Sequence, residues 1–295
     1  MKNTTKRVKR RFMLQLFLLR LFYRVYGNLF PKSAGNRAFE LWFTSPKFKP
    51  PAYERAADDS AQHETIRVNE LDVAVYSWQP ASGEYNKTIL FVHGWSGRGT
   101  QAVGFIQPLL DKGCHVVSFD APAHGKTAGR QTSIMEFVDT MLALEKHLAD
   151  KHHARFDAVI THSFGGMALA YAMSMGFKTG KAVLLCPPDS LELLLEGFQQ
   201  TLTLPAPAMR VMVRKSFAAY GQITRDAVNT VNNARNIDCP ALIIHDQDDS
   251  DVPVESSRRI AAAWPGSELV ITQGLGHRRI LRDPDTVEKV MDFLQ

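Results

Sequence analysis

The spacing of apolar and polar positions becomes regular after about residue 64 and predicts alternating strands and helices. Residues 65–69 and 71–78 alternate apolar with polar side chains, which is typical of two half-buried antiparallel strands. Continuous apolar runs predict buried strands at residues 87–94, 114–120, 157–163, 181–188, 240–246 and 268–272. Helical patterns occupy residues 99–113, 132–152, 164–176, 253–264 and 283–295. This order predicts an α/β fold with a mostly parallel, doubly wound sheet covered on both faces.

One stretch interrupts the alternation. Residues 189–236 contain helical patterns at 189–204 and 207–221 with no strand between them. We therefore expect three parts: an N-terminal segment at 1–62, an α/β core at 63–188 and 237–295, and a helical insertion at 189–236 that lies on the core.

The N-terminal segment has a different pattern. Residues 1–30 are a basic cluster followed by an apolar stretch that Arg20 and Arg24 break, so it is too short and too charged to span a membrane. On a helical wheel Lys9 shares a narrow stripe with the two arginines, and the apolar remainder holds Phe12, Leu16, Leu19, Tyr23 and Tyr26. Three interpretations stay open: peripheral contact with an anionic membrane, packing on the body or a second subunit, and a secretory signal, which Arg20 disfavours. Residues 31–62 are expected to be an extended linker.

Charge and cysteine content narrow the class of protein. The net charge of +5 conceals +11 in residues 1–50, where twelve Lys and Arg accompany only Glu40, and −6 in residues 51–295. A mildly acidic body disfavours nucleic-acid binding. Three cysteines without CxxC spacing, Cys114, Cys186 and Cys239, indicate buried thiols in a reducing, cytoplasmic compartment. Cys186 as a catalytic thiol lacks a local activating signature.

Candidate chemistry follows the predicted strands. Ligands meet parallel sheets at the carboxyl ends of the strands, and Ser163, Asp249 and His277 each follow such an end. A serine becomes nucleophilic when a histidine takes its proton, and a carboxylate orients that imidazole. The sequence therefore predicts a nucleophile, a base and an acid at one edge of the sheet, in the order Ser, Asp, His along the chain.

The surroundings of the serine, THSFGG, match a strained turn from strand to helix. Such a turn needs small residues two positions before and after the serine; Gly165 meets the second requirement and Thr161 does not meet the first. The stretch HGWSG follows the first buried strand, and it is expected to place the backbone N–H of Trp95 opposite that of Phe164. Two such donors would stabilise an oxyanion.

Five motifs together, HGWSG, FDAPAHG, THSFGG, DDSDVP and GLGH, resemble the α/β-hydrolase superfamily over roughly residues 64–295. The resemblance implies that Ser163 is the nucleophile, Asp249 the acid and His277 the base, that Trp95 and Phe164 are the oxyanion donors, and that residues 189–236 are a helical cap. It implies a serine hydrolase that cleaves a carboxylic ester or thioester of a small or acyl-chain substrate, without metal or organic cofactor.

Alternatives remain at this stage. An acyltransferase, peptidase or perhydrolase would use the same triad, and a non-catalytic pocket protein is suggested by Thr161.

Other carboxylates near Asp249 compete for the role of the acid, namely Asp189, Asp246, Asp248 and Asp251. His93 and His124 are expected to hold loops together. No helical pattern carries two metal ligands four residues apart with a third in place. The substrate and the oligomeric state stay open.

Overall fold

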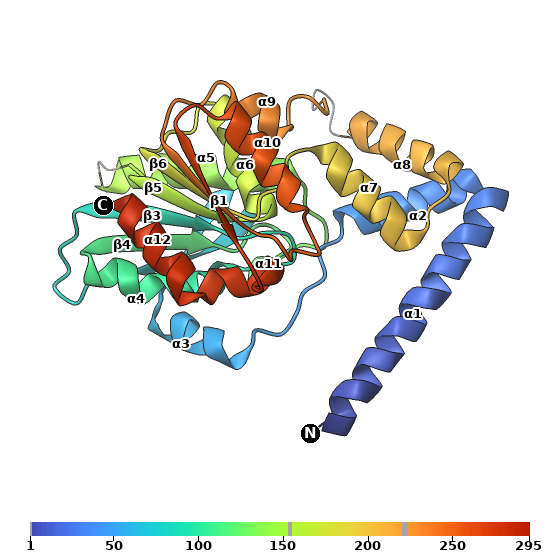
Figure 1. Ribbon diagram of the computed structural model, residues 1–295, viewed down its shortest axis with the longest axis horizontal. Helices are drawn as coiled ribbons and strands as arrows, with labels where there is room; N and C mark the ends of the chain where they lie inside the picture. The colour runs from blue at the N-terminus through green and yellow to red at the C-terminus, as the bar shows by residue number, and fades with distance from the viewer. Residues whose placement is uncertain (1, 153–154, 220–223) are drawn as a thin grey trace. The chain divides into compact units, whose positions relative to one another are not determined.

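The apolar runs form one eight-stranded sheet in the computed structural model, which describes residues 2–152, 155–219 and 224–295 (Figure 1). The strands are β1 Gln62–Val68, β2 Leu71–Trp78, β3 Lys87–Val92, β4 Cys114–Phe119, β5 Ala158–His162, β6 Lys181–Leu185, β7 Ala241–Asp246 and β8 Ser267–Thr272. Their order is β1-β2-β4-β3-β5-β6-β7-β8. β1 and β2 pair antiparallel, as do β2 and β4, and the remaining pairs are parallel. The predicted fold class is confirmed.

Helices cover both faces of this sheet. They are α3 Ala52–Ser60, α4 Val103–Asp111, α5 Ile134–His152, α6 Phe164–Ser174, α9 Thr230–Ala234, α10 Val254–Ala263, α11 Gly276–Arg279 and α12 Pro284–Leu294, with 3₁₀ turns η1 Gly99–Ala102 and η2 Ile280–Arg282. α4 packs on α12, while α6 packs on α5 and α9, and Figure 1 shows these two groups on opposite faces. β4, β5 and β7 are buried along their whole length, in agreement with their mostly apolar side chains.

The chain divides into two units. Unit 2 comprises residues 45–190 and 226–295 and contains the whole sheet, whereas unit 1 comprises residues 1–44 and 191–225. Unit 1 consists of α1 Lys2–Leu29, α2 Pro31–Phe43, α7 Leu191–Leu202 and α8 Ala206–Ala219. None of the described helices has the length and apolar character needed to cross a membrane.

Unit 1 has its own core. Its buried side chains come from all four helices and the α7–α8 connection: Tyr23, Ala34, Ala38, Leu195, Leu202, Leu204, Ala208 and Met212. α2 and α8 approach closely because Gly35 has no side chain; a Cβ atom there would lie 2.6 Å from the carbonyl oxygen of Ala208. The core explains why two segments far apart in sequence form one unit.

One expectation about these segments is wrong, and one boundary differs. Residues 31–62 are not an extended linker, because α2 and α3 occupy most of this stretch. Pro31 takes the first position of α2, where a helix tolerates proline, and small side chains let the helix pack on α8. The insertion is also not one piece: residues 191–225 belong to unit 1, and residues 226–236, including α9, belong to unit 2. The predicted helix at residues 207–221 extends into residues 220–223, which lie outside the described residues.

Gly104 provides a test of the packing between α4 and η2. A Cβ atom at Gly104 would lie 2.3 Å from the backbone oxygen of Leu281, so α4 would have to move. We predict that Gly104→Ala lowers the free energy of unfolding by about 1–3 kcal/mol. Urea unfolding followed by circular dichroism measures the change.

Gly197 of α7 is the matched control, since a Cβ atom there would have no neighbour within 4 Å. Gly197→Ala should raise the stability by up to about 1 kcal/mol, because alanine loses less backbone entropy than glycine in a helix. Equal stability of wild type and Gly104→Ala would contradict the packing described here.

Candidate active site

Ser163 lies at the turn between β5 and α6 with a backbone that few side chains adopt. Its φ is 52° and its ψ is −121°. The turn packs closely against the end of β3: a Cβ atom at Gly165 would lie 2.6 Å from the backbone oxygen of Val92. Glycine is therefore required at position 165, and the strained serine is held between a buried strand and the first turn of a helix, with its residue only partly buried.

Thr161, the departure from the expected pattern, has room in this turn. Its buried hydroxyl donates a hydrogen bond to the backbone oxygen of Val183 on β6, at 3.0 Å. A Cβ atom at Gly166 would lie 3.3 Å from the Thr161 hydroxyl oxygen, so the missing side chain of Gly166 makes the space for the threonine. The hydroxyl is directed to the neighbouring strand.

The HGWSG turn approaches the serine closely. A Cβ atom at Gly94 would lie 3.0 Å from the Cβ of Ser163, and the rings of Trp95 and Phe164 meet edge to face at 5.4 Å. In the part of the chain that the structure describes, the backbone N–H groups of Trp95 and Phe164 have no hydrogen-bond partner. Neither donor is therefore used by another described residue, which is a condition for an oxyanion site.

His93 and His124 hold the HGWSG turn to the next loop. The backbone N–H of Ser96 donates to Nε2 of His124 at 2.9 Å, and the N–H of Ala121 donates to Nε2 of His93 at 3.1 Å. Burial lowers the pKa of His93 to about 4 and that of His124 to about 3, so both rings are neutral and can accept these bonds. They have the loop-holding role that the sequence predicts.

Asp249 and His277 are in direct contact. Nδ1 of His277 donates to Oδ2 of Asp249 at 2.6 Å, and the carboxylate is completely buried. The N–H groups of Asp251 and Val252 donate to Oδ1 of Asp249 at 2.8 and 2.9 Å. His277 belongs to the short helix α11, where the sequence suggests a loop between the last strand and the last helix.

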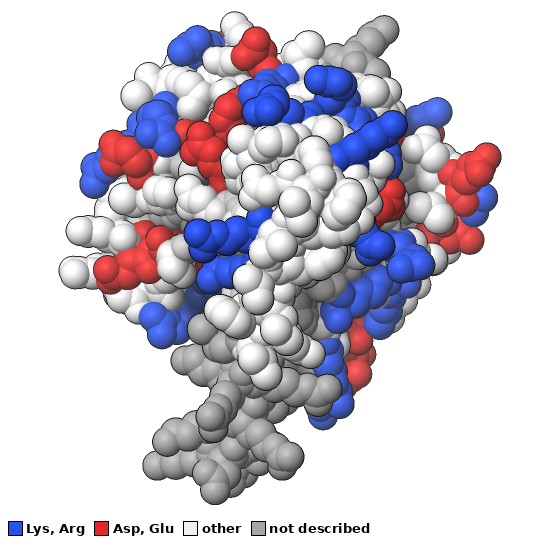
Figure 2. Space-filling model, turned by 90° about the vertical axis from the view of Figure 1, so that its right-hand side faces the viewer, with Lys and Arg blue, Asp and Glu red and all other residues white. Residues whose placement is uncertain are grey.

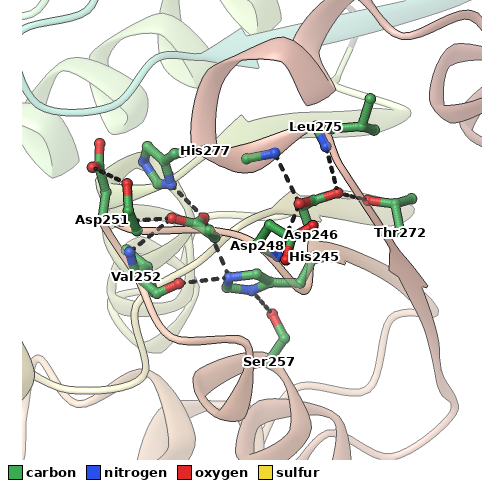
Figure 3. A network of polar contacts seen from close by, with 12 residues as sticks. His245, Asp246, Asp248, Asp251, Val252, Ser257, Thr272, Leu275 and His277 are labelled. Carbon is green, nitrogen blue, oxygen red and sulfur yellow. Dashed lines mark hydrogen bonds and ion pairs between the residues drawn. The ribbon is translucent and has the colours of Figure 1, made fainter.

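The competing carboxylates have other partners. Asp246 accepts bonds from the N–H groups of Leu275 and Gly276 and so fixes the turn before His277 (Figure 3). Asp189 pairs with Arg259, Asp248 accepts from the N–H of Gly274, and Asp251 lies 3.6 Å from Arg278. Among the described residues, Asp249 is the one carboxylate that bonds to the His277 ring.

The comparisons with known proteins identify the family of the chain. Residues 89–290 match the model of the alpha/beta hydrolase family, which is more than half of the chain. The chain belongs to the alpha/beta hydrolase family.

Relatives of this hydrolase include esterases and lipases. It is 26% identical over 231 residues to lysophosphatidylserine lipase ABHD12 of Xenopus tropicalis; the match covers 70% of this chain and 57% of that protein. The esterase Pf2001 of Pyrococcus furiosus has a similar structure, with a TM-score of 0.63, 22% identity and coverage of 85% and 95% of the two chains. A membrane phospholipase A described as a bacterial virulence factor has a TM-score of 0.61, 19% identity and coverage of 97% and 98%. The two structural similarities show the fold, and the chain spans less than two thirds of the length of the Xenopus relative.

The carboxyl group of Asp249 is held in its charged form. Burial alone would raise the pKa of Asp249, but hydrogen bonds from His245 and His277, the charge of His277 and the N–H of Val252 together hold it well below the ordinary value. Asp249 is therefore ionised across the neutral range and can stabilise a positive imidazole.

Sequence reasoning missed the support behind Asp249. His245 on β7 lies with Nε2 3.3 Å from Oδ2 of Asp249 and 2.9 Å from the Val252 oxygen, and its Nδ1 lies 2.6 Å from the Ser257 hydroxyl. Cys186 completes a group whose potential metal-ligand atoms lie within 4.8 Å of one another. Burial, followed by the nearby Asp249 charge, raises the pKa of the Cys186 thiol well above its ordinary value. With both ring nitrogens of His245 engaged and the thiol protonated, we interpret this group as support for the carboxylate.

His162 is a second residue that the sequence reasoning did not single out. It precedes Ser163, and its Nε2 donates to the backbone oxygen of His277 at 2.7 Å, with the two rings 4.7 Å apart. Burial and the neighbouring His277 lower the pKa of His162 to about 3, so the ring stays neutral. His162 ties the loop that carries His277 to the serine turn. In the described part of the chain, no hydrogen bond joins the Ser163 hydroxyl to His277 itself.

The buried carboxylate predicts a pH dependence of stability. The folded-state pKa of Asp249 lies below the unfolded value of about 4, so its contribution is present above that value and is lost as the pH falls towards the folded pKa. We predict that from about pH 6 to about pH 3 the stability of Asp249→Asn falls less steeply than that of wild type. Urea unfolding at a series of pH values measures both slopes. Asp251→Asn, which removes a half-exposed carboxylate two residues away, should keep the wild-type slope.

Thr161 provides a separate prediction. Thr161→Gly should lower the free energy of unfolding by about 1–2 kcal/mol, because a buried hydrogen bond is lost and glycine weakens a strand. Since the hydroxyl is directed to β6, the kcat/KM for a p-nitrophenyl ester should stay within about threefold of wild type. A rise of about tenfold or more would mean that the threonine crowds the serine turn.

Proposed function

We propose that the protein is a serine hydrolase that cleaves a carboxylic ester or thioester through an acyl-enzyme on Ser163. The observation that carries the proposal is the buried bond between Asp249 and Nδ1 of His277, since it leaves Nε2 of that ring free to act as a base. Metal and organic cofactors have no part in the proposed steps.

The first half of the reaction forms the acyl-enzyme. Nε2 of His277 takes the proton of the Ser163 hydroxyl as its oxygen attacks the substrate carbonyl carbon. The N–H groups of Trp95 and Phe164 stabilise the resulting oxyanion, and the positive imidazole is stabilised by Asp249. When the tetrahedral intermediate collapses, the bond to the leaving alcohol or thiol breaks and His277 returns the proton to it.

Water completes the cycle. His277 takes a proton from a water molecule, the hydroxide oxygen attacks the acyl carbon, and collapse of the second intermediate releases the acid and restores the Ser163 hydroxyl. A side-chain rotation at Ser163 brings its hydroxyl into bonding distance of His277, because catalytic hydrogen bonds tighten when substrate binds.

The substrate class is a small-molecule ester, including acyl-chain esters. The similarity to a lysophosphatidylserine lipase, an esterase and a phospholipase A supports this class. We keep the interpretation of the helical insertion, residues 189–236, as a cap that selects the substrate; the helices α7 and α8 are its main part. Activity against p-nitrophenyl esters of graded chain length reports the preference.

We further propose that the enzyme works in the cytoplasm with peripheral membrane contact through residues 1–30. The basic and apolar character of this segment supports the contact, as does the similarity to a membrane phospholipase A.

A non-catalytic pocket protein is the second candidate. The observation that favours it is the missing hydrogen bond between Ser163 and His277 among the described residues. Such a protein would bind esters without forming an acyl-enzyme.

A fluorophosphonate probe separates the two candidates. We predict that wild type is labelled and that Ser163→Ala is not, because the probe bonds to an activated serine oxygen. Hydrolysis of a p-nitrophenyl ester should fall at least about a thousandfold in Ser163→Ala, and by a similar factor in Asp249→Asn. Gel fluorescence and initial rates measure these effects.

The control is Ser82→Ala, which removes the hydroxyl of an exposed serine in unit 2 and should label and turn over as wild type does. Folded wild-type protein, verified by circular dichroism, that neither labels nor hydrolyses any ester of the series would favour the pocket protein.

A further inference from the structure

α1 has one face that packs inside unit 1. Tyr23 and Gly27 are buried on this face, and Tyr23 joins the core that α2, α7 and α8 share. Two hydrogen bonds fix the helix at its middle: Nε of Arg20 donates to the Thr201 oxygen at 2.9 Å, and the Thr203 hydroxyl donates to the Arg20 oxygen at 3.0 Å. The face opposite Tyr23 therefore stays on the outside of unit 1.

That outer face is apolar. Large side chains that are 40–67% exposed occupy it, and we call this set the α1 ridge: Leu14, Phe17, Leu18, Leu21, Phe22, Val25 and Leu29. At 100° per residue they fall within an arc of about 140° on the side away from Tyr23. So many large apolar side chains on one helix face are unusual on a surface that only water covers.

The charge of unit 1, which carries the ridge, is mostly positive. By sequence, unit 1 holds 14 Lys and Arg against 3 Asp and Glu, a formal net charge of +11, whereas unit 2 has −6. No acidic residue precedes Glu40. Exposed Arg20 and Arg24 lie along one border of the ridge. Figure 2 looks at the side of the molecule that carries α1 and shows a band of uncharged atoms with Lys and Arg on both sides.

The apolar face and the positive charge together favour one class of partner. A second copy of the chain would bring a charge of +11 against +11, which opposes association through the ridge. A nucleic acid would match the positive charge but would leave the ridge without an apolar environment. An anionic lipid layer satisfies both, because acyl chains cover the apolar face and headgroup phosphates lie at the level of the arginines.

We propose that the α1 ridge docks on an anionic phospholipid bilayer, with α1 in the plane of the interface and Arg20 and Arg24 at the headgroups. The inference rests on the peripheral contact proposed above, and it names the face and the lipid charge. It does not depend on the chemistry at Ser163, because every residue in it belongs to unit 1.

Vesicle co-sedimentation tests the proposal. Wild type should sediment with vesicles of phosphatidylcholine and phosphatidylserine, and at least about tenfold more weakly with vesicles of phosphatidylcholine alone. Leu18→Ser/Val25→Ser should lower the partition coefficient on the mixed vesicles at least about tenfold. The matched control, Leu41→Ser/Met175→Ser, removes two similarly exposed apolar side chains outside the ridge and should bind as wild type does.

Four results would each overturn the inference. Two concern wild type alone: no sedimentation with mixed vesicles, or equal binding to both vesicle types. The third is a ridge variant that binds the mixed vesicles as wild type does. The fourth is wild type that does not bind vesicles and is a dimer in light scattering, while the ridge variant is a monomer. The comparison of the two vesicle types uses wild type alone, so it tests the docking even if a variant fails to fold. Wild type and the variants should all hydrolyse a water-soluble ester at the same rate. If none of them hydrolyses it, the result counts against the proposed hydrolase and not against the docking.

Discussion

A buried carboxylate at the end of β7 is the constraint on which the candidate site depends. A negative charge removed from water is stable only with hydrogen-bond donors around it, and Asp249 has the His277 ring and two backbone N–H groups within 2.9 Å. The hydrogen bond that His277 donates to Asp249 therefore fixes the imidazole in one tautomer and one orientation. His245, anchored by Ser257 and the Val252 oxygen, holds the carboxylate from behind.

The α/β fold supplies the other half of the site through close backbone packing. The parallel strands β3 and β5 bring the HGWSG turn beside the serine turn, and glycines at positions 94 and 165 allow an approach that a side chain would block. Neutral His93 and His124 fasten the first turn, and His162 links the second to the His277 loop. The geometry around Ser163 thus arises from strand order, missing side chains and uncharged histidines acting together.

How much the sequence predicts differs between these features. The strands were predictable because buried parallel strands need continuous apolar side chains, and the motifs around Ser163, Asp249 and His277 could be recognised locally. His245 and His162 were missed because their partners lie far away in sequence; a histidine in the otherwise apolar run ALIIHD is the signal that could have revealed the first. α2 was missed because the whole of residues 31–62 was expected to be an extended linker, whereas Pro31 takes the first position of a helix, where proline is tolerated. The joining of α1 and α2 with α7 and α8 depends on side-chain packing that no local pattern encodes.

The central claim is that Asp249 orients His277 to activate Ser163. A crystal structure of the protein after reaction with a phosphonate ester tests it most directly. The account predicts phosphorus bonded to the Ser163 oxygen, its oxyanion in contact with the N–H groups of Trp95 and Phe164, and Nε2 of His277 within about 3.2 Å of the Ser163 oxygen while Nδ1 still bonds to Asp249. Phosphorus on a different residue, or a His277 ring turned away from Ser163 in the modified protein, would contradict it.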